Sequence, residues 1–243
     1  MQASEKPAPL ENAIKDEISK MSRLKVDGEV LLHMRLTQSL FKGSWKHSAM
    51  GLVQFARMMT LLSRAVMQDD PYAEWYLLKT YQALFDAKQA LKSMELKLNN
   101  YFESLRGITV TLITNDQALR FPLRFSTPFG FMGAYLLADV DYVLRQLATL
   151  KRIGLSLQQI VTAQALVIHV QRVFTAPRHW HPTGVTRQDV YDETETYKKA
   201  KELMGNVPDP VLKKEIEFAW MPKKKERKEM KEIVTGAIKK EKE

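Results

Sequence analysis

Residues 119–128 read LRFPLRFSTP. Apolar side chains stand at the odd positions, with two arginines and a proline between them, which is the period of a half-buried β-strand. The apolar positions are Leu119, Phe121, Leu123 and Phe125, and the positions between them are Arg120, Pro122 and Arg124. The pattern predicts a strand over residues 119–125 with one buried face and one face that carries two guanidinium groups.

Two helices are predicted after this strand. From Pro128 onward the apolar residues recur at steps of three and four, as the buried face of a helix requires. Residues 153–156 interrupt this pattern, and Ser156 with Gln159 three residues later has the spacing of a capping box. The second helix is therefore expected to begin at Ser156 and to continue to Phe174.

The predicted strand needs a partner, because a lone strand leaves its backbone donors and acceptors without hydrogen bonds. If the partner is the same strand of a second copy, the two form an antiparallel ribbon backed by two helices per subunit, which fits the DNA major groove. Residues 107–175 resemble this ribbon-helix-helix arrangement. An ordinary αβ core with two surface arginines accounts for the same pattern.

Two other stretches of the chain are also predicted strands. Residues 108–114, ITVTLIT, precede a turn at 115–117 and would make an intrachain hairpin with residues 119–125. Residues 28–37 also alternate, and we interpret them as an extra strand that covers a sheet edge or as a second polar-faced ribbon. Pro122 lacks an N–H, which disfavours a central strand and is compatible with a two-stranded ribbon.

The first half of the chain predicts two helices. Residues 48–68 are apolar nearly all round and predict a buried helix. Asp70 is a plausible N-cap for the next helix, since Pro71 suits its first position and Glu74 suits its positive end. This helix is expected to run to Leu105, roughly 50 Å at the standard rise.

Leucine recurs every seven residues along this second helix, from Leu77 to Leu105. Such a register predicts a long packed seam, although Thr80 and Ala87 at the accompanying positions make it weak as a self-sufficient zipper. We interpret the helix as a scaffold within a bundle. The alternative is that it forms part of a dimer seam.

The predicted elements make an α+β, predominantly helical protein, with a ribbon-helix-helix-like core elaborated by the long leucine-rich helix and extra strands. The length fits one elaborated domain, which we expect, or two small ones. The 243 residues are enough to bury a sizeable core. We expect a flexible N-terminal arm over 1–27, a domain over 28–215 and a basic charged tail over 216–243. The formal charge of +9 favours a polyanionic partner, and only about +4 of it comes from residues 223–243, where nine Lys or Arg face five Glu.

Several function classes find no support in the sequence. There is no cysteine, which excludes disulfides and thiolate metal sites. The pair His179 and His181 has no further ligand at a recognisable spacing, so neither a metal nor a cofactor is expected, and no catalytic motif stands out. No secretory signal or membrane-spanning run is present, which makes the bacterial cytoplasm the expected location and a membrane partner unexpected.

Four segments together resemble a known family. They are residues 69–78, DDPYAEWYLL; 122–139, PLRFSTPFGFMGAYLLAD; 184–190, GVTRQDV; and 202–205, ELMG. These segments resemble the integrating-conjugative-element proteins that include the plasmid conjugative-transfer activator AcaB. The likeness spans about Gly43 to Val211. It implies a dimeric, ribbon-helix-helix-like DNA-binding protein that activates transcription of conjugation genes.

The predicted site combines the strand pattern with this implication. Arg120 and Arg124 would enter the major groove of double-stranded DNA, where arginine binds guanine in bidentate fashion. Phosphates would be held by Lys151, Arg152 and Ser156, and the core of the homodimer would consist of Leu119, Phe121, Leu123 and Phe125. Second-choice DNA-binding residues are His33, Arg35, Thr37, Lys223, Lys224 and Lys225.

The prediction also includes one further candidate partner and one competing function. RNA polymerase is a candidate partner of an activator. The competing function is a non-enzymatic structural or interaction protein of the conjugation machinery that docks a partner through its leucine-repeat helix.

Overall fold

The computed structural model describes residues 28–43, 50–154, 163–216 and 221–222. The predicted arm over 1–27, Ser156 and the lysines at 223–225 lie outside these residues. The division into arm, domain and tail therefore stays a prediction.

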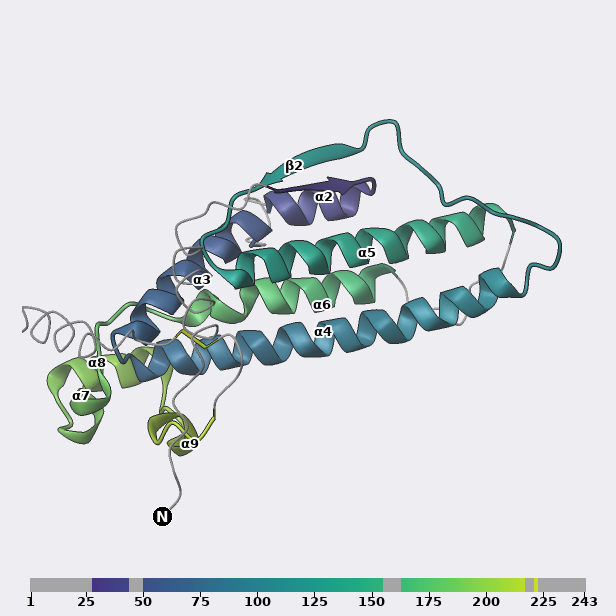
Figure 1. The fold of residues 1–243 in the computed structure, drawn as a ribbon. Coiled ribbons are helices and arrows are strands. Elements are labelled where there is room, and N and C mark those ends of the chain that lie inside the picture. The colour runs from purple at the N-terminus through teal and green to yellow at the C-terminus, as the bar shows by residue number, and fades with distance from the viewer. Residues whose placement is uncertain (1–27, 44–49, 155–162, 217–220, 223–243) are drawn as a thin grey trace, which may run out of the picture.

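Four helices form the body of the molecule (Figure 1). They are α3 (Leu52–Met67), α4 (Pro71–Glu103), α5 (Pro128–Arg152) and α6 (Ala163–Thr175). Each of the four packs against the other three, and a continuous apolar core lies between them. Phe55 of α3 stacks on Phe174 of α6 in this core, with ring centroids 5.0 Å apart. The chain is predominantly helical, as predicted.

Helix α4 begins where the sequence predicted. The Asp70 side chain accepts hydrogen bonds from the backbone N–H groups of Tyr72 and Ala73, at 2.9 and 3.0 Å. Pro71 occupies the first turn, where its missing N–H has no cost. The helix has 33 residues and ends at Glu103, two residues before the predicted end.

The leucine seam of α4 faces the core of its own chain. Leu77, Leu84, Leu91 and Leu98 are buried, and so are Thr80, Ala87 and Met94 at the accompanying positions. This face packs against α5 and α6 within the bundle. The scaffold interpretation is confirmed, whereas the dimer seam and a partner docked on these leucines are wrong, because the bundle already covers them.

The strand predicted at residues 119–125 is present as β2 (Leu119–Leu123). Its partner is β1 (Gly28–Leu32), which pairs with it antiparallel so that Gly28 stands opposite Leu123 and Leu32 opposite Leu119. The prediction of an extra strand covering a sheet edge is confirmed. The expectation that a second copy supplies the partner is wrong for this edge, because β1 of the same chain occupies it.

The other predicted strand, residues 108–114, is not a strand. Its backbone is held by side chains of α5: the Ile113 N–H donates to Thr149 Oγ1 at 2.9 Å, and Arg145 Nε donates to the Ile113 carbonyl at 2.9 Å. These contacts use the donor and acceptor that a hairpin would need. The segment therefore crosses the end of the bundle as an extended connection between α4 and β2.

The alternation in the sequence continues to Thr37, but strand β1 stops at Leu32. It stops because the chain turns into a helix after two more residues. Helix α2 (Arg35–Lys42) follows after a two-residue turn. The Asp141 carboxyl group, on α5, accepts the backbone N–H groups of His33 and Met34 and the hydroxyl of Thr37. These bonds hold the two residues between β1 and α2 against α5, at the point where the chain leaves the strand and enters the helix.

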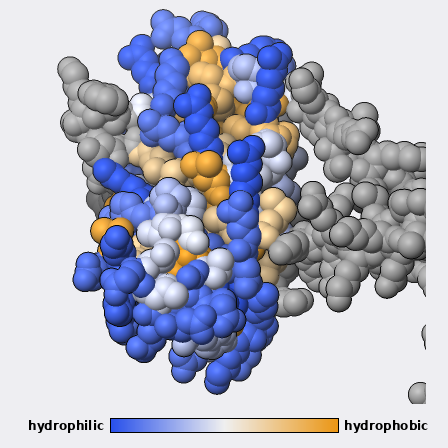
Figure 2. All heavy atoms as spheres, turned by 90° about the vertical axis from the view of Figure 1, so that its left-hand side faces the viewer, coloured by the Kyte–Doolittle hydropathy of each residue, from blue (hydrophilic) through white to orange (hydrophobic). Residues whose placement is uncertain are grey.

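Short helices gather at the first turns of α4. They are η1 (Ala176–His179), α7 (Arg187–Tyr191), α8 (Glu195–Met204) and α9 (Asp209–Leu212). Helix α8 ends with Gly205 as its C-cap, which has a positive φ of 82°. Figure 2 shows this end of the molecule, where hydrophilic residues predominate and hydrophobic residues gather in a strip between them.

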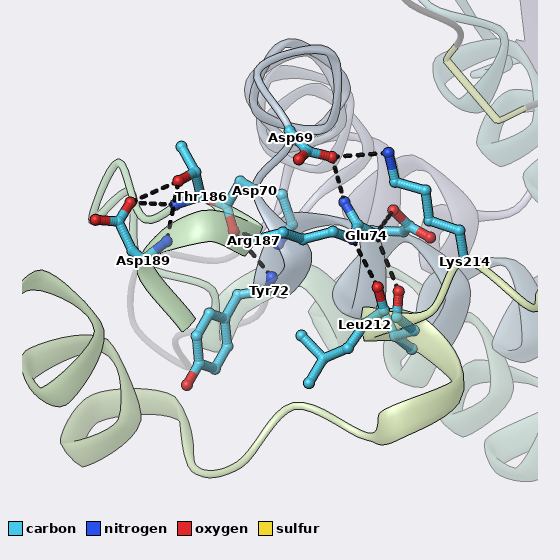
Figure 3. A network of polar contacts seen from close by, with 11 residues as sticks. Asp69, Asp70, Tyr72, Glu74, Thr186, Arg187, Asp189, Leu212 and Lys214 are labelled. Carbon is cyan, nitrogen blue, oxygen red and sulfur yellow. Dashed lines mark hydrogen bonds and ion pairs between the residues drawn. The ribbon is translucent and has the colours of Figure 1, made fainter. Parts of the chain in front are cut away.

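Arg187 ties these short helices to the bundle (Figure 3). It is buried, and its guanidinium forms ion pairs with Glu74 and with Asp69 at 2.5 Å and donates to the carbonyls of Val211 and Leu212. The Tyr72 hydroxyl adds a bond to the Gly205 carbonyl at 2.7 Å. Burial raises the pKa of Tyr72 to about 12, so it stays a neutral donor.

Candidate nucleic-acid interface

The outer face of the β1–β2 ribbon carries the first predicted DNA-binding residue. Glu29, Leu31, Arg120 and Pro122 are exposed on this face, whereas Val30 and Leu123 are buried on the other. Arg120 forms an ion pair with Glu29 across the two strands, and the two side chains are 66% and 57% exposed. An ion pair this exposed stabilises the fold by about 0–1 kcal/mol, so a nucleic acid could displace it at little cost.

Arg124 follows directly after β2 and is also exposed. Phe125 beside it turns inward, because its ring packs edge-on against Phe131 with centroids 5.4 Å apart. Gly130 makes room for this ring, since a Cβ at position 130 would lie 2.4 Å from the Phe125 side chain. Arg120 and Arg124 are therefore both exposed, one within β2 and one directly after it, and their role in DNA binding stays a prediction.

The four residues predicted to close a dimer core mostly pack inside their own chain. Leu123 is buried, and Phe121 stacks on Phe41 of α2 at 4.1 Å. Phe125 packs on Phe131, and Leu119 remains 38% exposed. The predicted dimer core is therefore wrong, because α2 and α5 of the same chain already cover this apolar face.

The second-choice residues divide into one surface residue and two structural ones. Arg35 is exposed and donates to Gln117 Oε1 at 3.2 Å beside the ribbon. Thr37 is fully buried against Asp141, so its prediction as a DNA contact is wrong. His33 is half-buried, and its carbonyl accepts the Asn115 side-chain amide at 2.8 Å.

The predicted phosphate contacts lie at the C-terminal end of α5. Lys151 and Arg152 are exposed in the last turn of α5, where positive charge suits the helix dipole. Asp141 of the same helix meets the residues directly after β1, and Lys151 stands ten residues further along α5, about 15 Å by the standard rise. The structure does not bring these two residues together with Arg120 and Arg124, and Ser156 and Lys223–Lys225 fall outside the described residues.

Two polar features escaped the sequence analysis. Residues 48–68 were interpreted as apolar all round, yet α3 exposes a stripe that contains Arg57 and Arg64. Asp141 lies on the apolar face of α5 that Val140 and Leu144 share, and a lone acid on such a face is the signal that could have revealed it. Its hydrogen bonds to the residues directly after β1 lie where the ribbon ends.

Other kinds of site receive no support from the described residues. Within them, no group of three or more His, Asp or Glu side chains is placed to hold a metal ion. The described helices include none that is long and apolar enough to cross a membrane.

Comparison with known proteins assigns the family. The family model described as transcriptional regulator AcaB matches residues 20–223, which is most of the chain. The chain belongs to the AcaB family of transcriptional regulators. The resemblance inferred from residues 69–78, 122–139, 184–190 and 202–205 is confirmed, and a role of this AcaB-family protein in regulating transcription follows.

A solved structure supports the same fold. The chain matches the crystal structure of selenomethionine-containing AcaB from uropathogenic E. coli with a TM-score of 0.50 and 12% sequence identity. The match covers 79% of this chain and 97% of the other. At this identity the likeness shows that the two AcaB-family proteins share a fold. No curated protein matches the chain.

Proposed function

We propose that this AcaB-family regulator is a sequence-specific DNA-binding activator of conjugation genes that reads the major groove with the outer face of its β1–β2 ribbon. The observation that carries the proposal is the ribbon itself: a two-stranded antiparallel element whose exposed face presents Arg120, with Arg124 at its end. A two-stranded ribbon fits the major groove, and arginine donates in bidentate fashion to guanine O6 and N7.

The remaining residues of the outer face suit the same role. Leu31 and Pro122 are exposed and apolar, and apolar side chains in the groove contact the methyl group of thymine. Glu29 holds the Arg120 guanidinium while no DNA is bound, and a guanine edge or a phosphate replaces it on binding. Arg35 and Gln117 extend the polar surface along one edge of the ribbon.

A homodimer is part of this proposal, although its contact differs from the one predicted. The apolar face of β2 is occupied within the chain, but no strand of the described residues pairs with the second edge of β2. Two copies that meet there would place their ribbons side by side around a two-fold axis. An inverted-repeat operator follows from that symmetry.

The other parts of the proposal concern location and further contacts. An activator of this kind acts in the bacterial cytoplasm and has RNA polymerase as a candidate partner. Lys151 and Arg152 remain proposed phosphate contacts outside the ribbon, since Lys151 stands about 15 Å along α5 from Asp141, which meets the residues directly after β1.

Fluorescence anisotropy with an operator duplex and a scrambled duplex tests the proposal. Arg120→Ala and Arg124→Ala should reduce the preference for operator, each by about 1–3 kcal/mol of discrimination. Lys97→Ala, on the exposed side of α4 at the far end of the bundle, is the matched control and should leave the preference unchanged. If both ribbon variants keep the wild-type preference, the ribbon is not the reading element.

A further inference from the structure

Helix α3 presents a basic face that the proposed function does not use. Its exposed residues follow one stripe at spacings of three and four, and the opposite face is buried in the bundle. The stripe consists of Gln54, Arg57, Leu61 and Arg64, with Gln68 directly after the helix. No Asp or Glu occurs between Leu52 and Met67, so nothing within the helix offsets the two arginines.

The nearest acids in the sequence are engaged elsewhere. Asp69 forms ion pairs with Arg187 at 2.5 Å and Lys214 at 2.9 Å, and Asp70 caps α4. Within the part of the chain that the structure describes, no ion pair joins Arg57 or Arg64 to an acid. The two guanidinium groups therefore present a positive surface that is not neutralised locally.

This surface adjoins the ribbon. The hydroxyls of Thr60 and Ser126 lie 3.2 Å apart, which places the middle of α3 against the segment that leaves β2. Thr60 is three residues from Arg57 and four from Arg64, about one helical turn in each direction. Ser126 is two residues after Arg124, so the stripe on α3 and the arginines of the ribbon lie on neighbouring parts of one surface.

We infer that the stripe of α3 holds the phosphate backbone of the duplex next to the groove that the ribbon reads. This inference rests on the proposed function and adds to it the element that orients the ribbon on DNA. Arg57 and Arg64 are about 10 Å apart along the helix axis, on the order of three nucleotides of one DNA strand. Phosphate contacts of this kind set register and orientation and carry no sequence information.

The test compares the double variant Arg57→Ala/Arg64→Ala with a control that removes the same charge, Lys92→Ala/Lys97→Ala. The control residues are exposed on α4, outside the β1–β2 ribbon and α3. Binding to operator and scrambled duplex is measured by anisotropy between 50 and 200 mM salt. Losing two phosphate contacts should lower the salt slope by about 2, so wild type should lose about 10-fold more affinity than the double variant over this range.

Three further results decide the inference. The double variant should keep its preference for operator over scrambled duplex, and Arg57→Lys/Arg64→Lys should restore the wild-type salt slope. If the salt slope of the alanine variant equals that of the control, the inference is overturned. If that variant binds DNA normally but fails to activate a reporter, the stripe contacts a protein, which also overturns it.

The failures of the two proposals are distinguishable. Wild-type protein that binds neither duplex at 50 mM salt ends the proposed function and this inference together. Wild-type protein that binds with a preference for operator, beside a double variant with an unchanged salt slope, ends this inference alone. Circular dichroism of each variant verifies that the helices are retained.

Discussion

Asp141 on α5 accepts a hydrogen bond from the hydroxyl of Thr37 on α2 at 2.5 Å, across 104 residues of sequence. The same carboxyl group accepts the backbone N–H groups of His33 and Met34, which directly follow β1. One buried acid thus attaches the end of the strand and the start of the helix to the bundle. The orientation of the ribbon depends on this contact.

Replacing Asp141 should therefore destabilise the protein more than replacing Asp139, an exposed acid on the same helix. Asp141→Ala leaves the backbone N–H groups of His33 and Met34 without their acceptor and the Thr37 hydroxyl with the Met34 carbonyl alone, at a cost of about 2–3 kcal/mol in the free energy of unfolding. Asp139→Ala changes an exposed acid on the same helix and should cost less than about 0.5 kcal/mol. Urea unfolding measures both, and equal midpoints for the two variants would contradict the role assigned to Asp141.

The buried pair of Arg187 and Glu74 should respond in a strongly non-additive way. Both side chains are nearly inaccessible to solvent, so Arg187→Met leaves Glu74 buried and uncompensated, at a cost of about 3–5 kcal/mol. Arg187→Met together with Glu74→Gln removes both charges and should cost clearly less than the sum of the single variants. A double-mutant cycle in urea measures the coupling, and additive effects would show that the pair is not a unit.

Two variants of Asp70 separate the effect of its charge on stability from the effect of its hydrogen bonds. Asp70→Ala removes the cap of α4 and should cost about 0.5–2 kcal/mol at neutral pH, whereas Asp70→Asn keeps an accepting oxygen and should cost little.

The pH dependence of these variants has a defined sign. Burial raises the pKa of Asp70 above its usual 3.8, so the folded state binds a proton more readily than the unfolded state does. Wild type should gain stability relative to Asp70→Asn as the pH falls through the raised pKa toward 3.8. Chemical unfolding at several pH values measures this difference, and a constant difference would contradict it.

Glu29 should weaken DNA binding in the wild-type protein. The acid competes with DNA for the Arg120 guanidinium, and an exposed pair contributes up to about 1 kcal/mol, so Glu29→Gln should raise affinity by up to about fivefold. Glu195→Gln breaks a comparable exposed pair with Lys198 on α8 and should leave affinity unchanged. Anisotropy at fixed salt measures both, and a loss of affinity in Glu29→Gln would show that the pair positions Arg120 on DNA.

Some features of the fold could be read from local patterns. The alternation at residues 119–123 predicted that Arg120 and Pro122 face solvent and that Leu123 is buried, although Leu119 is 38% exposed, and Asp70 with Pro71 predicted the start of α4. Thr186 and Asp189 form a capping box at the start of α7, a signal of the same local kind. These patterns are reliable because a helix or strand repeats its faces at a fixed period and its ends need local hydrogen bonds.

The candidate site was only partly predictable for the same reason. Arg120 and Arg124 are exposed because their positions in the strand period dictate it. The partner of β2, the burial of Thr37 and the contact between Thr60 and Ser126 depend on residues 66 to more than 100 positions apart. No periodicity along the chain encodes which distant residue meets a given face.

The sequence by itself determined the alternation of β2, the buried leucine face of α4 and the start of α4, since these depend on neighbours within a few residues. The tertiary structure alone decided that the leucines of α4 face their own bundle, that β1 pairs with β2, and that α3 lies beside the ribbon. An apolar face must be covered, but which surface covers it is settled by how the whole chain packs.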